Sequence, residues 1–159
     1  MPVTIGLLAD RPELIDALAL AYEAQWPSWY GADGRGDAHA DMTARARRDG
    51  VPCGVVAADG DRAVGACALA EESMSRRGEF GAWIVGLWIA PEHRRKGLAL
   101  KVLEAAVGQA GALNIAEVRA GTAAAAGVFI RAGWSELAPV LHEGEEIRIF
   151  AARPVALEA

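Results

Sequence analysis

The stretch from Gly86 to Ala99 constrains the fold more than any other part of this chain. It reads as an apolar strand, a short basic turn that contains Gly97, and the start of a helix. A helix start presents unpaired backbone N–H groups and the positive end of the helix dipole, so it can bind a phosphate group. Gly97 lets the backbone approach a ligand closely, and Arg94, Arg95 and Lys96 add positive charge. From these residues alone, anion binding and an ordinary solvated loop both remain open.

Two common phosphate-binding motifs are excluded at this junction. The Walker sequence Gly-x-x-x-x-Gly-Lys-Ser/Thr does not occur, and Gly-x-Gly-x-x-Gly is missing at the end of the strand. A second glycine pair, Gly34 and Gly36, follows no expected strand, so we interpret it as part of a flexible loop.

The rest of the chain alternates between expected strands and helices, which predicts a mixed α/β sheet with helices packed on it. A turn at Asp59-Gly60-Asp61 predicts a hairpin. Gly86 lies inside an expected strand, where glycine often marks a bulge. The expected strands are 3–9, 53–58, 63–70, 80–89, 114–120, 134–141 and 146–151; the expected helices are one that starts at Pro12, and 37–49, 98–110 and 122–131.

Composition narrows the class of protein. The 159 residues suit one domain, 1–159, and the 53% hydrophobic content favours a globular fold. A net charge of −5 argues against general nucleic-acid binding. Two cysteines, Cys53 and Cys67, are too few for a disulfide framework and are interpreted as small buried hydrophobes. The scattered histidines predict no metal site, and the absence of a leader or a long apolar stretch predicts a cytoplasmic protein without membrane contact.

Two motifs resemble the GNAT superfamily of N-acetyltransferases. Arg94-x-x-Gly97-x-Ala99 matches the family's Arg/Gln-x-x-Gly-x-Gly/Ala signature, and residues 87–94 resemble its hydrophobic strand and Pro-Glu-x-Arg turn. The spacing of the family's second motif is met by Thr122, Ala125, Phe129, Gly133 and Trp134. The resemblance implies one GNAT-like domain with a mostly antiparallel sheet of about six to seven strands flanked by about four helices.

The resemblance also implies a cosubstrate and a reaction. Acetyl-coenzyme A would donate its acetyl group by direct attack of a primary amine, carried by a small molecule or a peptide N-terminus. The backbone of Leu87 and Trp88 would stabilise the oxyanion. The residues implied to bind the cosubstrate are Leu87, Trp88, Ile89, Arg94, Arg95, Lys96, Gly97, Leu98, Ala99, Thr122, Ala125 and Phe129.

The chain departs from the family at the proton-transfer positions. The usual tyrosine, often the proton donor to the departing thiolate, is Phe129, which has no proton to give. A thiol with a pKa of about 8.5 is nevertheless a tolerable leaving group. The position of the family's usual glutamate matches Trp83. Glu79 and His142 are the candidate bases, with Glu72 and Glu146 as alternatives.

An aromatic acceptor site is expected from Trp26, Trp29, Tyr30 and Trp83, with Trp88 possible. Such walls, with Asp33 and Asp37 nearby, suit a cationic amine, although core packing of the tryptophans remains open. A catalytically weak acyl-coenzyme A sensor or partner module is the alternative function. Many members of this family pair through their C-terminal strands, so the resemblance implies a possible homodimer.

Overall fold

A seven-stranded sheet in the order β1-β2-β3-β6-β7-β9-β8 organises the computed structural model, which describes residues 2–154. All neighbouring strands are antiparallel except β6 and β7, which are parallel. A mixed and mostly antiparallel sheet was expected, and this is confirmed. The strands are β1 (Val3–Leu7), β2 (Cys53–Asp59), β3 (Arg62–Ala70), β6 (Ala82–Ile89), β7 (Val118–Thr122), β8 (Ser135–His142) and β9 (Glu145–Ala152), and a separate hairpin contains β4 (Glu72–Ser73) and β5 (Arg76–Arg77).

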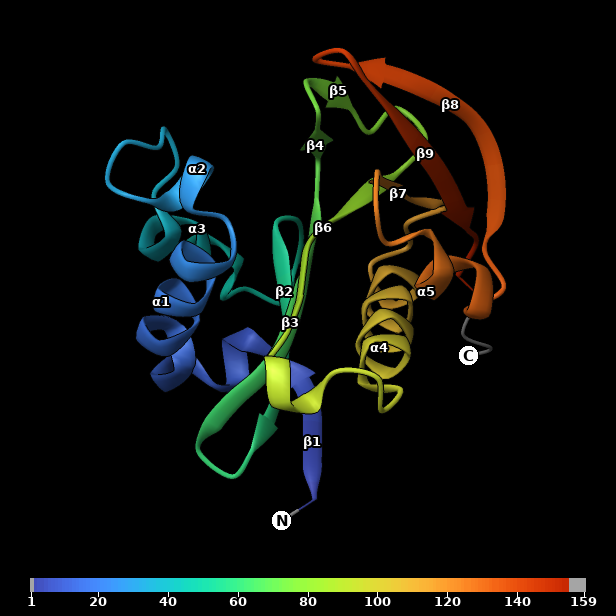
Figure 1. The fold of residues 1–159 in the computed structure, drawn as a ribbon. Coiled ribbons are helices and arrows are strands. Elements are labelled where there is room, and N and C mark those ends of the chain that lie inside the picture. Colours follow the sequence, from blue (N-terminus) through green and yellow to red (C-terminus); the bar gives the residue numbers. More distant parts are fainter. Residues whose placement is uncertain (1, 155–159) are drawn as a thin grey trace.

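Helices cover both faces of this sheet (Figure 1). One layer contains α1 (Ile15–Gln25), α2 (Pro27–Tyr30) and α3 (Ala38–Arg45), and the other contains α4 (Leu98–Ala112) and α5 (Ala126–Arg131). Because both faces are covered, β2 and β3 are buried along most of their length and consist largely of small apolar residues. Both cysteines, Cys53 and Cys67, are buried there, as the sequence predicts.

The N-terminal helical layer differs from the expectation. The first strand ends at Leu7 and two 3-10 turns follow it, so α1 begins at Ile15 and not at Pro12. Trp26 leaves the helical conformation (φ −126°, ψ 66°), and Pro27 then starts a separate short helix in place of a loop. Residues 2–154 therefore contain five α-helices, of which α2 is the unexpected one.

Other helix and strand boundaries also differ from the expected ones. The expected helix 37–49 ends at Arg45, and the strand expected from residue 80 begins at Ala82. The strand expected over 114–120 occupies Val118–Thr122, because Asn114 adopts a left-handed conformation (φ +60°) just after α4. The hairpin of β4 and β5 was not predicted at all, since its residues are mostly charged or polar.

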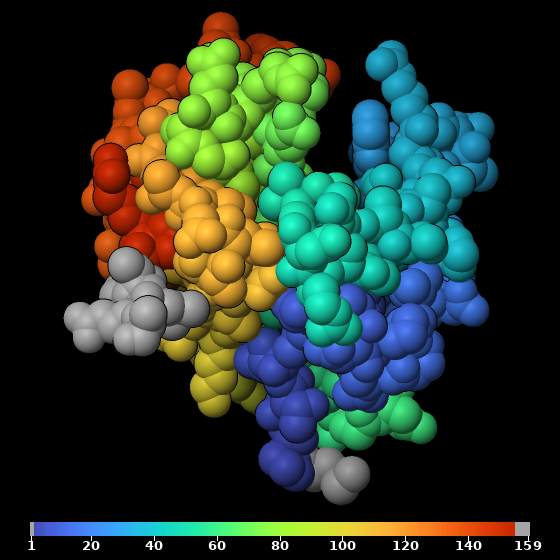
Figure 2. Space-filling model, turned by 180° about the vertical axis from the view of Figure 1, so that it is seen from behind, coloured from blue at the N-terminus to red at the C-terminus, as the bar shows by residue number. Residues whose placement is uncertain are grey.

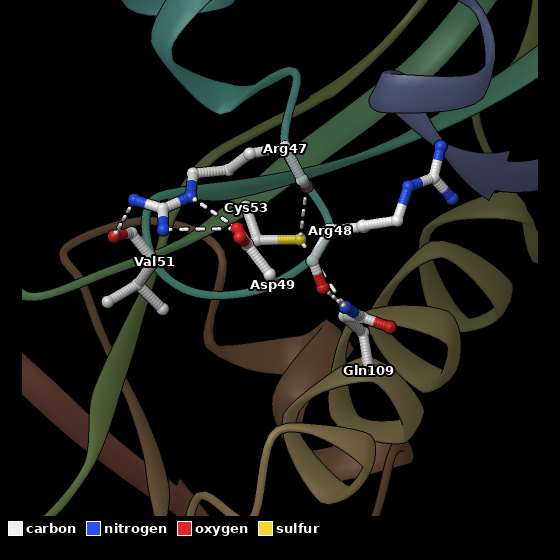
Figure 3. Close-up of polar contacts among 6 residues, drawn as sticks. All are labelled: Arg47, Arg48, Asp49, Val51, Cys53 and Gln109. Atoms are coloured by element: carbon white, nitrogen blue, oxygen red, sulfur yellow. Dashed lines mark hydrogen bonds and ion pairs between the residues drawn. The ribbon is translucent and has the colours of Figure 1, made fainter.

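A polar cluster joins α4 to the segment between α3 and β2 (Figure 3). The side-chain amide of Gln109 on α4 donates to the carbonyl of Arg48 at 3.0 Å and lies 3.6 Å from the Cys53 Sγ. The Arg47 guanidinium donates to Asp49 and to the carbonyl of Val51. These contacts fix the segment between α3 and β2 against α4, at the start of β2.

β6 and β7 separate soon after they begin. Their parallel pairing is limited to Ala82 with Val118 and Trp83 with Arg119. Beyond Trp83, the side of β6 that faces β7 therefore has no strand partner. This opening, next to the start of α4, is the feature of the fold that positions the candidate site.

Candidate active site

A bulge interrupts β6 at the opening, as the sequence predicts for Gly86. Ala66 of β3 pairs with Trp88 and Ala68 pairs with Val85, so Cys67 alone lies opposite both Gly86 and Leu87. Gly86 has φ +63°, a conformation that glycine adopts without steric cost.

Contacts from the N-terminal helical layer fix this bulge. The Tyr22 hydroxyl donates a hydrogen bond to the Gly86 carbonyl at 2.5 Å. A Cβ on Gly86 would lie 3.0 Å from the Tyr22 Cε2 and 3.3 Å from the Arg45 Nη1. Glycine is therefore required here both for its backbone conformation and for the close approach of two side chains. Tyr22 was not among the residues singled out from the sequence.

The bulge leaves backbone donors on the open side of β6. Ala90 donates its amide to the Val64 carbonyl of β3. Because alternate amides of an antiparallel strand point to opposite sides, those of Leu87 and Ile89 point away from β3. By the same alternation the Trp88 amide faces β3. Of the two backbone donors expected from the resemblance, Leu87 thus faces the opening, where Ile89 joins it in place of Trp88.

The turn before α4 holds a second set of donors. Within residues 2–154, the amides of residues 95–100 donate to no other protein group. Arg95 (φ +62°) and Gly97 (φ +81°) are both left-handed, and such conformations turn successive N–H groups toward one concave surface. A Cβ at Gly97 would meet nothing within 4 Å, so the space in front of this turn is open. This geometry fits a diphosphate.

A cavity of about 370 Å³ lies in front of these amides. Its lining residues are Ile89, His93, Arg94, Arg95, Gly97, Leu98, Ala99, Leu100, Val128 and Arg131. The last two come from α5 and were missed, because nothing in the sequence shows which face of that helix borders the turn.

Arg94 ties the turn to two other elements. Its Nε donates to the Ile89 carbonyl at 2.8 Å, and its Nη2 donates to the Gln25 side chain of α1 at 2.9 Å. These bonds position the turn against β6. The neighbouring side chains of Arg95 and Lys96 are exposed and supply positive charge.

The second motif runs from the end of β7 through α5. The Thr122 Oγ1 accepts from the amides of Ala124 (3.3 Å) and Ala125 (2.7 Å), so it orders the turn before α5. The helix expected over 122–131 begins only at Ala126, and its N-cap is Ala125 and not Thr122. Phe129 is 4% exposed, and its ring lies 5.1 Å from that of Trp134. This position therefore supplies apolar packing and no hydroxyl group.

The expected acceptor residues divide into two groups. Tyr22 is the centre of one group, with ring centroids of Trp26 at 5.1 Å, Tyr30 at 6.2 Å and Trp88 at 6.2 Å. Trp29 is half exposed and contacts Tyr30. The other group contains Trp83, which is buried in a separate apolar cluster with Ile147 and Ile149.

A hollow separates the segments that carry these two groups. Figure 2 shows a notch between the loop after α2, coloured light blue, and the lime segment that leads into β6. The predicted acidic residues Asp33 and Asp37 belong to that loop. The candidate bases lie on other elements: Glu79 is exposed in the turn before β6, and His142 ends β8 with its Nε2 3.9 Å from Glu143.

Both tyrosines of the aromatic group are protonated at neutral pH. Burial raises the pKa of Tyr22 well above its usual value. Burial, followed by the hydrogen bond to Asp41 at 2.6 Å, raises the pKa of Tyr30 to about 12.

Within residues 2–154, no group of His, Cys, Asp and Glu side chains is arranged to hold a metal ion. None of the described helices combines the length and apolar character of a membrane span.

Comparisons with solved structures show the same fold. An aminoglycoside 6'-acetyltransferase type Ii is 14% identical with a TM-score of 0.76, covering 99% of this chain and 100% of that chain. An aminoglycoside 6'-N-acetyltransferase complexed with coenzyme A is 12% identical with a TM-score of 0.75, covering both chains completely. A GNAT-family acetyltransferase from Bacillus cereus ATCC 10987 is 14% identical with a TM-score of 0.69, covering 98% of this chain and 99% of that chain.

Sequence comparison identifies the family. A comparison with curated proteins finds no significant match. The sequence pattern of the acetyltransferase (GNAT) family, however, matches residues 18–134, which include both motifs. The expected enzyme class and its acetyl-coenzyme A cosubstrate are thereby confirmed. The chain belongs to the GNAT family of acetyltransferases.

Proposed function

We propose that this chain, as one domain over residues 1–159, acetylates a primary amine of a small molecule or a peptide N-terminus by direct attack in a ternary complex. One observation carries the proposal. Ile89 and most of the residues with unpaired amides, namely Arg95 and residues 97–100, line the same cavity. The amides at the start of α4 suit a diphosphate. The amide of Ile89 suits the reacting end of a molecule that enters between β6 and β7.

The turn at α4 would hold the cosubstrate. Acetyl-coenzyme A supplies an acetyl group as a thioester, joined through a long arm to a nucleotide diphosphate. The amides of residues 95–100 donate to the diphosphate, and the helix dipole favours its negative charge. Arg95 and Arg131, which line the cavity, add positive charge.

The bulge would stabilise the reacting carbonyl. Leu87 and Ile89 direct their N–H groups into the opening, where they donate to an oxygen that gains negative charge during acyl transfer. A preorganised donor of this kind contributes about 2.7–4 kcal/mol to lowering the barrier. Tyr22 holds these donors in place through its bond to Gly86.

Proton transfer requires a base for the acceptor amine. An alkyl ammonium has a pKa of about 10, so the acceptor must lose a proton before it attacks. Glu79 and His142 are the residues proposed to accept it, directly or through one water molecule. Because Phe129 has no hydroxyl, the departing thiolate would take a proton from the attacking ammonium or from water.

A specific observation also favours the alternative, a coenzyme A-binding sensor without turnover. Phe129 is buried among aromatic rings, so the usual proton donor of the family is absent here. Both functions use the same cavity, and they differ only in whether acetyl transfer follows binding.

Thiol release measured over a panel of primary amines separates the two functions. We expect turnover with at least one small amine or short peptide, and its loss in the variant Gly97→Glu. Cofactor binding without any turnover would favour the sensor, and the absence of both would refute the two functions together.

A further inference from the structure

Arg45, the last residue of α3, is a half-buried cation that has no carboxylate partner among residues 2–154. Within residues 2–154, no carboxylate oxygen lies within 4.0 Å of its nitrogens, and its buried Nη1 has no hydrogen-bond acceptor. The next two arginines along the chain do have carboxylate partners: Arg47 pairs with Asp49 at 3.1 Å, and Arg48 pairs with Asp10 at 2.6 Å. Removing part of a charge from water is costly unless it is paired, so a guanidinium whose Nη1 is buried and has no acceptor suits an anionic ligand.

The side chain of Arg45 ends at the bulge. Its Cβ packs against Gly54 of β2, where a Cβ would lie 3.1 Å away. Its guanidinium approaches Gly86 of β6, where the corresponding distance to Nη1 is 3.3 Å. The guanidinium carbon also lies 5.8 Å from the centre of the Tyr22 ring, which offers a cation–π contact but no neutralising charge.

The groups that face Arg45 from the surrounding elements do not neutralise its charge. One of them is the hydroxyl of Tyr30, which is close enough to interact with Arg45 but stays uncharged because its pKa is raised to about 12. The hydroxyl of Tyr22 is bonded to Gly86, and burial keeps this tyrosine neutral by raising its pKa. Burial also raises the pKa of Cys67, on β3, to about 12. Asp41, one turn earlier on α3, accepts a hydrogen bond from the Tyr30 hydroxyl at 2.6 Å and makes no ion pair with Arg45.

We propose that Arg45 binds a carboxylate of the acceptor, which makes the acceptor a free α-amino acid. This inference rests on the proposed function, because it places the acceptor amine beside the Leu87 amide. Gly86 directly precedes Leu87, and neighbouring Cα atoms are about 3.8 Å apart. A carboxylate held over Gly86 therefore leaves room for an amine only one carbon away. A peptide N-terminus has an amide at that position and gives Arg45 no anion to bind.

The adjoining surface indicates an apolar side chain on this amino acid. Val85 directly precedes Gly86 and packs against the cluster of Trp83, Ile147 and Ile149. Met74, in the turn between β4 and β5, packs against the same cluster. Leucine and phenylalanine are therefore suitable probes.

The reaction balances without any further reactant. The amino nitrogen forms a bond to the acetyl carbon while the carbon–sulfur bond breaks, and the electron pair of that bond leaves on sulfur. Of the three ammonium protons, one stays on the amide nitrogen, one ends on the thiol and one is released to solvent. The products are an N-acetyl amino acid and coenzyme A.

The test measures kcat/KM by thiol release for L-leucine and L-phenylalanine and for their α-amides, which lack the carboxylate. The wild type should prefer each acid over its amide by at least about tenfold, as expected for one charge-assisted hydrogen bond. Arg45→Met should lower kcat/KM for the acids by about 100-fold, mainly through KM, because a bidentate contact is lost. Its kcat/KM for the amides should stay within about threefold of wild type.

Matched controls separate recognition from folding. Arg48→Met removes an exposed arginine of the same chain segment and should leave the acid-to-amide ratio unchanged. Arg45→Met should melt at or above the wild-type temperature, because it removes an unpaired charge. Arg45→Lys keeps the charge without the planar fork and should fall between the wild type and Arg45→Met.

The possible failures are distinguishable. Equal rates for acids and amides in the wild type would overturn the role of Arg45 while leaving the acetyltransferase function intact. An equal loss for acids and amides in Arg45→Met, together with a lower melting temperature, would show a structural role instead. No turnover with any amine would overturn the proposed function itself and this inference with it.

Discussion

The hydroxyl of Tyr22 donates a 2.5 Å hydrogen bond to the carbonyl of Gly86, a residue 64 positions further along the chain. This bond joins the middle of α1 to the bulge of β6. It also lies beneath the guanidinium of Arg45 and next to the amide of Leu87. One contact therefore connects the N-terminal helical layer, the candidate acceptor site and the backbone donors proposed to stabilise the reacting carbonyl.

Removal of this hydroxyl should affect both stability and catalysis. Tyr22→Phe leaves the Gly86 carbonyl without its donor, which should lower the free energy of unfolding by about 1–3 kcal/mol. Acetyl transfer should fall by about tenfold or more, because the bulge donors lose their support. Urea unfolding and thiol release measure the two effects. Tyr30→Phe is the control, since its hydroxyl bonds Asp41 on α3, and a loss of equal size there would contradict the account.

Alanine substitutions at Gly86 and Gly108 should change the free energy of unfolding in opposite directions. Gly86→Ala forces a side chain into a left-handed conformation and against Tyr22, so the free energy of unfolding should fall by about 2 kcal/mol. Gly108 lies inside α4, and a Cβ there would meet nothing within 4 Å. Gly108→Ala should therefore raise the free energy of unfolding by about 0.5–1 kcal/mol. Chemical denaturation of both variants tests the pair, and changes of the same sign would be inconsistent with the structure.

The tyrosine side chains should ionise at a higher pH in the folded protein than in the unfolded protein. The chain has only two tyrosines, Tyr22 and Tyr30, and the pKa of each is raised. The protein unfolded in guanidinium should show tyrosinate absorbance with a midpoint near pH 10, the ordinary value for this side chain. The folded protein should show almost none at that pH.

The raised tyrosine pKa values also determine how the stability of the protein changes with pH. A raised pKa in the folded state means that the stabilisation is complete below the unfolded pKa near 10 and is lost as the pH rises toward 12. The free energy of unfolding should therefore fall between these pH values, and Tyr30→Phe should reduce that fall. Half-ionised tyrosine at pH 10 in protein that is still folded would rule out the burial of these side chains.

Gln109 should matter for stability but not for cofactor binding. Gln109→Ala removes the bond to the Arg48 carbonyl and the contact with Cys53, which should cost about 1 kcal/mol. Its position far along α4 from the turn at Gly97 should leave the affinity for coenzyme A unchanged. Thermal unfolding and calorimetry provide the two readings, and a variant with unaltered stability but weaker binding would argue against this assignment.

The sequence predicted the part of the site that is built from consecutive residues. The strand, the turn with Gly97 and the start of α4 follow one another directly, and the short turn after Thr122 leads into α5. Their geometry depends on local backbone rules, which the spacing of glycine, threonine and apolar residues reveals. The bulge at Gly86 was found for the same reason, since a glycine in the middle of an apolar strand weakens regular pairing and indicates a bulge.

The rest of the site depends on contacts between distant segments. Nothing near Tyr22 or Arg45 in the sequence indicates that both reach the same glycine of β6. Trp83 and Trp26 were both expected at the acceptor site, yet Trp83 lies in a separate apolar cluster and Trp26 packs on Tyr22. The hairpin of β4 and β5 was missed because its charged residues lack the apolar alternation by which strands are recognised.

Calorimetric titration with coenzyme A tests the central claim most directly, namely that the amides at the start of α4 bind the diphosphate. The comparison uses the wild type, Gly97→Glu, and Gly108→Glu, which places the same charge on the exposed surface of the same helix. We expect binding by the wild type and by Gly108→Glu, and an affinity at least about 100-fold lower for Gly97→Glu. Equal affinity in all three proteins, or no binding by the wild type at millimolar coenzyme A, would contradict the account.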